Sequence, residues 1–129
     1  MDGIVLAFDF GLKRIGVALG NTLLKTASPL TIIHGESNTS RFGAIESLIR
    51  EWQPVVLVVG LPLHADGSEH DMTRRCRRFA NQLRGRFNIS TVLVDERYSS
   101  SVIHVREGQA DDALAASLIL QQFFYESTI

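Results

Sequence analysis

The sequence predicts an α/β fold in which one mixed five-stranded sheet carries helices on both faces. The first third of the chain alternates its side chains with the two-residue period of strands, and glycines interrupt it where turns are expected. The remainder alternates helical patterns with short apolar strands, which is typical of parallel βαβ units. The predicted order is therefore three antiparallel strands followed by helix, strand, helix, strand and helix.

The antiparallel part is expected to begin with a strand at residues 4–10, which has apolar side chains on one face and Asp9 on the other. A turn at residues 11–13 leads to a second strand at residues 15–19. A third apolar stretch runs through Ile33. These segments predict a three-stranded meander.

The later elements are recognised by a change of period. Apolar residues at three- and four-residue spacing indicate helices. A continuous apolar run indicates a central parallel strand that is covered on both faces. The expected elements are a helix from Ser40 that Pro54 closes, the central strand at 55–60, a helix whose buried stripe runs from Met72 to Leu83, a strand at 91–96 and a last helix at 112–124.

Length and composition limit the classes of protein. The chain has 129 residues, a net charge of −1 and 45% apolar residues, which indicates a single globular domain over residues 1–129. No apolar run has the roughly 18 residues of a membrane helix, and Asp2 stands where a signal peptide would carry a base. Cys76 is the only cysteine, which excludes an internal disulfide and a cysteine-based zinc site. We therefore expect a cytoplasmic protein without membrane contact.

Three acids stand where the predicted fold could bring them together. Asp9 ends the first strand, Glu96 ends the strand at 91–96, and Asp112 begins the last helix. If the two strands are parallel neighbours, both acids project from the carboxyl edge of the sheet, where open α/β folds bind ligands. Asp112 shares a helix face with apolar residues and is therefore expected to point at the sheet.

Three close carboxylates repel one another unless a cation neutralises them. Carboxylate oxygens favour hard divalent ions, so the expected cofactor is one or two Mg²⁺ or Mn²⁺ ions. Two such ions can hold the attacking water and the leaving oxygen of a phosphodiester. The alternative from spacing alone is structural, because Asp112 could complement a helix dipole and Asp9 could begin a turn.

Arginines are concentrated in one segment that contains no acid between Met72 and Phe87. Such a run repels itself, and a polyanion would relieve the repulsion, whereas the alternative is an ordinary solvated helix face. Several other polar residues adjoin the three acids and could contact phosphate, or serve as turn and cap residues. The candidates for nucleic-acid contact are Lys13, Arg14, Arg74, Arg75, Arg78, Arg97 and Ser100.

The loop after the central strand should border the site. Gly60 would let the backbone approach a ligand, and Pro62 would stiffen the exit from the strand. His64 lies in this loop, although an exposed histidine without a role is the alternative. The four histidines do not have the spacing of a zinc site.

Five segments, taken in order, resemble the YqgF/RuvX family over nearly the whole chain. They are DFGLKRIG (9–16), VVGLPLHADGSE (58–69), RRFANQLRGRF (77–87), DERYSS (95–100) and DDALAASLIL (111–120). The resemblance implies a three-layer ribonuclease H-like fold and a metal site formed by Asp9, Glu96 and Asp112. It also implies a nuclease, associated either with the 5′ end of pre-16S ribosomal RNA or with Holliday junctions.

The resemblance leaves more than one function open. Processing of structured RNA is the first interpretation, and cleavage of branched DNA, which needs a dimer for two symmetric cuts, is the second. The third is a nucleic-acid binding protein with weakened catalysis, because the segment at 98–111 is shorter and less basic than is usual in the family. We expect a monomer or a weak homodimer.

Overall fold

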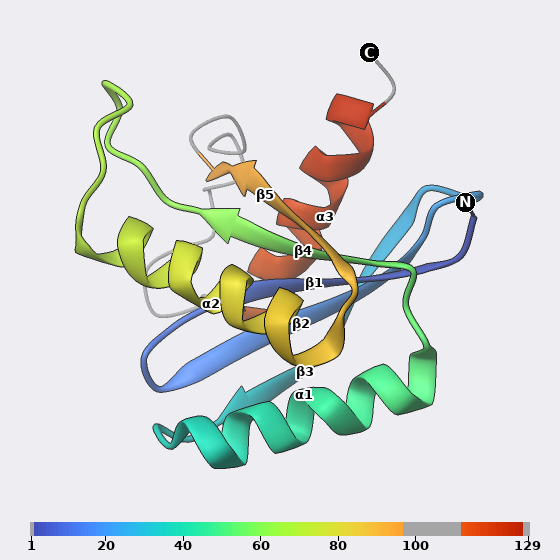
Figure 1. Cartoon of the computed structure of the whole chain (residues 1–129). Coiled ribbons are helices and arrows are strands. Elements are labelled where there is room, and N and C mark those ends of the chain that lie inside the picture. Colours follow the sequence, from blue (N-terminus) through green and yellow to red (C-terminus); the bar gives the residue numbers. More distant parts are fainter. Residues whose placement is uncertain (1, 97–111, 128–129) are drawn as a thin grey trace.

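The structure is a computed structural model that describes residues 2–96 and 112–127 (Figure 1). One sheet organises it, with the strand order β3-β2-β1-β4-β5. The elements in chain order are β1 (Ile4–Phe10), β2 (Arg14–Asn21), β3 (Thr26–His34), α1 (Asn38–Trp52), β4 (Val56–Leu61), α2 (Asp71–Phe87), β5 (Ser90–Asp95) and α3 (Asp112–Ser127).

The sheet has the mixed pairing that the sequence predicts. β1, β2 and β3 pair antiparallel, with Asp9 opposite Gly16. β4 pairs parallel with β1 on one side and with β5 on the other. The sheet is therefore a meander extended by two parallel strands, and β3 and β5 form its edges.

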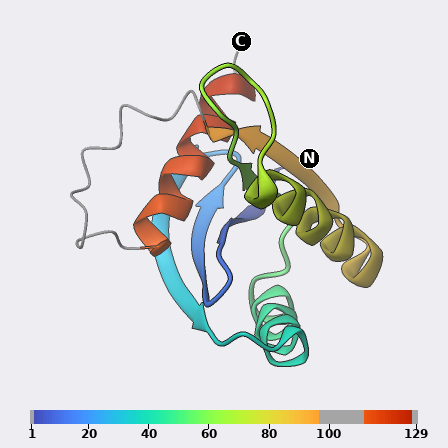
Figure 2. The same ribbon diagram turned by 90° about the vertical axis from the view of Figure 1, so that its left-hand side faces the viewer.

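Helices cover both faces, so the molecule has three layers. Figure 2 shows α3 on one side of the sheet and α1 and α2 on the other. Leu6 and Phe8 pack into the core beneath α1 and α2, whereas Val5 and Ala7 pack beneath α3. The alternation along β1 thus divides its side chains between two cores. In the described part of the chain, no helix has the length and apolar character needed to cross a bilayer.

The arrangement of strands that was considered for the two acids is not the one observed. The strands that carry Asp9 and Glu96 are not neighbours, because β4 lies between β1 and β5. The continuous apolar run of β4 explains this, since its residues Leu57, Val58 and Val59 are fully buried between the two helical layers. A strand of that kind takes the central position among the parallel strands. The two acids must therefore approach each other across β4.

The helix ends differ slightly from the predicted ones. α1 begins at Asn38 and α3 continues to Ser127. α1 ends before Pro54 through Gln53, which adopts a left-handed conformation with φ of 47°. The predicted stripe of α2 is buried from Cys76 onward, and Met72 at its start is half-buried.

Candidate active site

Asp9 lies at the end of β1 on the face that α3 covers. Its neighbours Phe8 and Phe10 turn to the opposite face. The carboxylate is half-buried, and burial raises its pKa from 3.8 to about 6, with the charge of Asp112 as the second cause. Asp9 is therefore a strand acid whose ionised form is disfavoured by its surroundings.

Gly16 explains how Asp112 comes close to Asp9. Gly16 pairs with Asp9 across the antiparallel ladder, and directly opposite residues place their side chains on the same face. A Cβ atom at Gly16 would collide with the backbone carbonyl of Asp112. The missing side chain thus leaves room for the first turn of α3 beside Asp9.

Gly60 serves a similar purpose on the other side of Asp9. It lies on β4, one residue beyond the last paired residues of β1 and β4, and opposite Val94 of β5. A Cβ atom at Gly60 would stand 2.9 Å from the carboxyl carbon of Glu96. The side chain of Glu96 therefore lies over β4, in the space that a larger residue would fill.

Glu96 is the second acid with a perturbed pKa. Burial raises its pKa from 4.5 to about 7, followed by the charges of Asp9 and Asp95. Asp9 is thus electrostatically coupled to Asp112 on one side and to Glu96 on the other. The fold thus brings Glu96 and Asp112 within electrostatic reach of Asp9, although the three acids come from segments distant in the sequence.

Asp112 has a cationic partner. The Nε atom of Arg14 lies 2.9 Å from its Oδ2 atom, and the two side chains are 60% and 25% exposed respectively. Within residues 2–96 and 112–127, no three acidic, histidine or cysteine side chains stand close enough to form a ready metal site. In this structure the Asp112 carboxylate is paired with Arg14.

The donor set nevertheless fits a hard divalent cation. It consists of carboxylates, which are the ligands that hard divalent ions prefer, and burial raises the pKa of both Asp9 and Glu96, followed by the charge of a neighbouring acid. Arg14 already balances Asp112, but its exposed side chain can leave that position. Asp9, Glu96 and Asp112 are therefore the residues that could hold a cation.

The arginines of α2 are more fully paired than the sequence indicates. Arg75 lies 2.7 Å from Asp71, and Arg74 lies 3.9 Å from the same carboxylate. Arg77 lies 3.0 Å from Glu69. The two acids that precede the run therefore reduce the self-repulsion expected from it.

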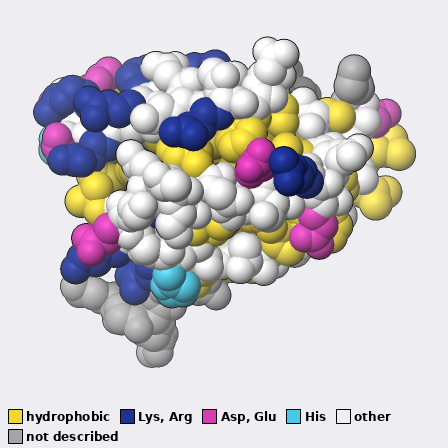
Figure 3. All heavy atoms as spheres, turned by 60° about the horizontal axis from the view of Figure 1, so that its bottom comes forward, with side chains coloured by type: hydrophobic (Ala, Val, Ile, Leu, Met, Phe, Trp, Pro, Cys, Tyr) yellow, Lys and Arg dark blue, Asp and Glu magenta, His cyan; other side chains and the backbone are white. Residues whose placement is uncertain are grey.

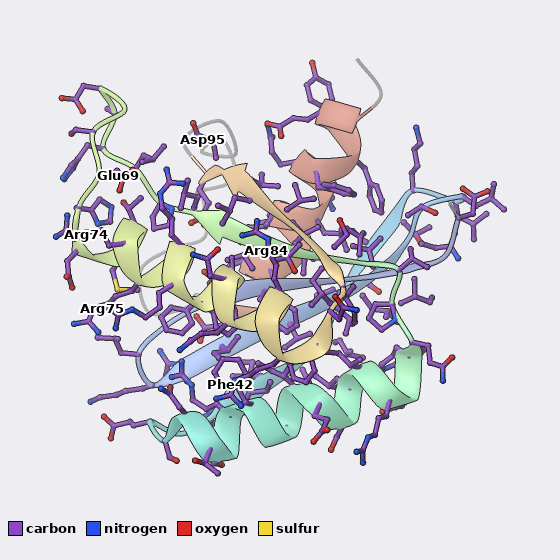
Figure 4. All side chains as sticks on the ribbon, in the orientation of Figure 1. Phe42, Glu69, Arg74, Arg75, Arg84 and Asp95 are labelled. Atoms are coloured by element: carbon purple, nitrogen blue, oxygen red, sulfur yellow. The ribbon has the colours of Figure 1, made fainter. Side chains whose placement is uncertain are left out.

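The surface of α2 nevertheless keeps a positive charge. Arg78 has no ion-pair partner among the residues that the structure describes. Figure 3 shows Lys and Arg side chains gathered at one end of the molecule, over the N-terminal half of α2. In Figure 4, Arg74 and Arg75 project from the first turns of α2, while Arg84 lies near its other end. Arg84 donates to the Thr91 carbonyl oxygen at 2.8 Å, which ties it to β5.

The other residues predicted to border the site or to contact nucleic acid lie in loops and turns, or outside the described residues. The Thr73 hydroxyl of α2 donates to the carbonyl of Pro62 and so anchors the loop after β4. His64 is exposed, and its ring centre lies 4.8 Å from that of His70. Among the described contacts, none links His64 to the three acids. Lys13 is exposed in the β1–β2 turn. Arg97 and Ser100, together with the segment at 98–111, lie outside the described residues.

Sequence reasoning missed Arg41. It is 3% exposed, although arginine is rarely buried, and its Nη1 atom donates to the carbonyl oxygens of Gly11, Leu12 and Gly35. This side chain joins the β1–β2 turn to the end of β3. The only hint in the sequence is its place beside Phe42 on the buried stripe of the first predicted helix.

The comparisons with known proteins decide the family. Residues 3–126 match the family model described as "RuvX: Holliday junction resolvase". The chain belongs to the RuvX family. A relative from Paraburkholderia xenovorans is 53% identical over 128 residues, which cover 95% of this chain and 88% of the relative, and it carries the name "Putative pre-16S rRNA nuclease". A relative from Burkholderia mallei has the same identity, coverage and name. The family and the nuclease class expected from the sequence are both confirmed.

Solved structures support the RuvX assignment at the level of the fold. RuvC of T. thermophilus in complex with a Holliday junction substrate is similar with a TM-score of 0.59 and 14% identity, over 98% of this chain and 96% of that one. The fowlpox virus Holliday junction resolvase is similar with a TM-score of 0.58 and 14% identity, over 98% of this chain and 99% of that one. The ribonuclease H-like architecture that the resemblance implied is thereby confirmed.

Proposed function

We propose that this RuvX-family protein is a divalent-metal-dependent nuclease whose metal ligands are Asp9, Glu96 and Asp112. The observation that carries the proposal is Asp9, a half-buried acid that is coupled to both other carboxylates and has a raised pKa. Acids with a strongly perturbed pKa are concentrated at functional sites. Mg²⁺ or Mn²⁺, as one or two ions, is the proposed cofactor.

When bound, the ions would neutralise the carboxylates and supply an activated water for phosphodiester hydrolysis. The protein fold determines where the three carboxylates stand. Gly16 and Gly60 leave room for Asp112 and Glu96 on the two sides of Asp9, so that the start of α3 and the residue after β5 would supply ligands to a site built on β1. These rigid elements fix the positions of the carboxylates better than loops would.

Arg14 is proposed to act in both the metal-free and the metal-bound protein. Its guanidinium holds Asp112 at 2.9 Å and is largely exposed. A cation at Asp112 would displace Arg14, which would then be free to contact the phosphate of the substrate. Arg14 thus stabilises the free protein and becomes available when the site is loaded.

The proposed substrate is RNA, at the 5′ end of pre-16S ribosomal RNA. The names of the 53% identical relatives support RNA as the substrate, because these relatives match nearly the whole chain. The basic face of α2, where Arg78 has no described ion-pair partner, supports nucleic acid as the partner in general. Arg74, Arg75, Arg78, Lys13 and Arg14 are the proposed contacts within the described residues.

Branched DNA is the second candidate substrate. The description of the matching family model favours it. Paired cuts in a four-way junction require two copies of the site related by symmetry. A monomeric protein would therefore favour the RNA substrate, and a dimer would be compatible with either.

Purified protein incubated with pre-16S ribosomal RNA and with four-way DNA junctions, in Mg²⁺, Mn²⁺ or EDTA, tests the proposal. We expect cleavage of RNA with either ion, none with EDTA, and none by Asp9→Asn. Glu51→Gln, which alters an exposed acid on α1, is the matched control and should cleave normally. Junction cleavage alone would favour the second candidate. Binding without cleavage in any metal would contradict both and indicate a nucleic-acid binding protein.

A further inference from the structure

A small pocket lies on the side of the sheet opposite to Asp9. It opens between the β1–β2 turn, the start of α1 and the first half of α2, and its volume is about 200 Å³. Its polar lining has three arginines and one acid. The lining residues are Phe10, Leu12, Glu36, Asn38, Arg41, Arg75, Arg78 and Gln82.

Arg41 forms the inner wall of this pocket. Its side chain is 3% exposed, yet the oxygens that receive its hydrogen bonds are all backbone carbonyls, at 2.7–3.2 Å from Nη1. Its Nε atom is buried without a partner. The guanidinium carbon lies 4.9 Å from the centre of the Phe10 ring. Among the residues that the structure describes, no carboxylate neutralises this buried cation; such a charge is unfavourable, and an anion in the pocket would compensate it.

Arg75 and Arg78 form the outer wall from successive turns of α2. Arg75 binds Asp71 through Nε at 2.7 Å, which leaves its terminal nitrogens for another acceptor. Arg78 has no hydrogen-bond or ion-pair partner within the described parts of the chain. The amide groups of Asn38 and Gln82 can add further donors. Glu36 is exposed at the same pocket and is the one group that would oppose an anion.

The size and place of the pocket limit the anion. A volume of about 200 Å³ is below the roughly 300–1,000 Å³ of ordinary small-molecule sites, so one small group fits better than a whole nucleotide. Leu12 follows Asp9 by three residues, so this part of the rim lies within about 10 Å of Asp9 along the chain. A few nucleotides, at about 3.4 Å each along a strand, cover that distance.

We propose that the pocket between Arg41, Arg75 and Arg78 binds one backbone phosphate of the nucleic acid, a few nucleotides from the phosphate that is cleaved. The inference rests on the proposed function. Arg41, Arg75 and Arg78 would thus position the nucleic acid from the face of the sheet opposite to the acids. A strand that crosses the carboxyl edge of the sheet would be held on both faces.

The test measures binding without cleavage, in EDTA, with a fluorescently labelled RNA hairpin at several salt concentrations. We expect Arg78→Ala to weaken binding about tenfold, which is the effect of one lost charge-assisted hydrogen bond. It should also reduce the slope of log affinity against log salt by about 0.7–0.9. Arg77→Ala is the matched control, because Arg77 immediately precedes Arg78 on α2, pairs with Glu69 and does not line the pocket. It should change affinity less than about twofold.

Glu36→Gln provides a change of opposite sign and should tighten binding. Equal affinities and equal salt slopes for Arg78→Ala and Arg77→Ala would overturn the proposal. A second arm titrates inorganic phosphate and follows the Nε–H signal of Arg41 by NMR. If phosphate shifts that signal while Arg78→Ala leaves RNA binding unchanged, the pocket binds a free anion and the backbone assignment is wrong.

The cleavage assay keeps the two proposals separate. With an active enzyme, Arg78→Ala should raise KM and leave kcat at saturating RNA within about twofold, as expected for an interaction that positions the substrate. A wild-type protein that binds RNA but never cleaves it would refute the nuclease function. The comparison of Arg78→Ala with Arg77→Ala in EDTA would still decide the pocket.

Discussion

Replacement of Asp9 by Asn should stabilise the metal-free protein at high pH. The pKa of Asp9 is raised from 3.8 to about 6 in the folded protein. The cost of this raised pKa to folding therefore grows between about pH 4 and pH 6 and is complete above about pH 6, whereas below about pH 4 the carboxyl is protonated in both states and the effect disappears. The shift corresponds to about 3 kcal/mol of unfolding free energy at pH 8, because one pKa unit is worth about 1.4 kcal/mol.

Thermal unfolding of the wild type and of Asp9→Asn in EDTA, at pH 4 and pH 8, measures this effect. For a domain of this size, about 3 kcal/mol corresponds to a Tm increase of about 10 °C, expected at pH 8 and largely absent at pH 4. Glu51→Gln, at an exposed position, should change the unfolding free energy by less than about 0.5 kcal/mol. An Asn variant that is no more stable than the wild type at pH 8, or equally stabilised at both pH values, would refute the reasoning.

Three other changes should have measurable effects. Glu96→Gln should also stabilise the metal-free protein, and its gain should grow from about pH 4.5 and level off above about pH 7, because the pKa of Glu96 is raised from 4.5 to about 7 on folding. Gly16→Ala should lower the unfolding free energy by about 1–3 kcal/mol and abolish cleavage by displacing Asp112, whereas Gly43→Ala, where a Cβ meets nothing within 4 Å, should leave cleavage unchanged. Arg14→Ala should strengthen Mn²⁺ binding severalfold in a calorimetric titration, because it removes the cation that competes for Asp112.

Much of the fold can be predicted because its signals are local. The alternation in β1 assigns Leu6 and Phe8 to one core and Ala7 to the other, as the structure has them. The continuous apolar run of β4 indicates a strand covered on both faces. The same run favours a central place for β4, and in the structure β4 lies between β1 and β5.

The site was only partly predictable because its key contacts are not local. The acids Asp9, Glu96 and Asp112 could be selected because each ends a strand or begins a helix. The pairing of Arg14 with Asp112 joins segments 98 positions apart, and no spacing rule indicates it. Gly16 could have been recognised as a contact point only with α3 in place. The tertiary packing therefore decides which charges meet.

The metal site is the central claim, and manganese binding tests it most directly. Crystals of the protein soaked in Mn²⁺ should show anomalous density between the carboxylates of Asp9, Glu96 and Asp112, with the Arg14 side chain moved away from Asp112. Crystals of Asp9→Asn treated in the same way should show none there. Wild-type crystals in which Mn²⁺ binds elsewhere, while Arg14 keeps its contact with Asp112, would contradict the account.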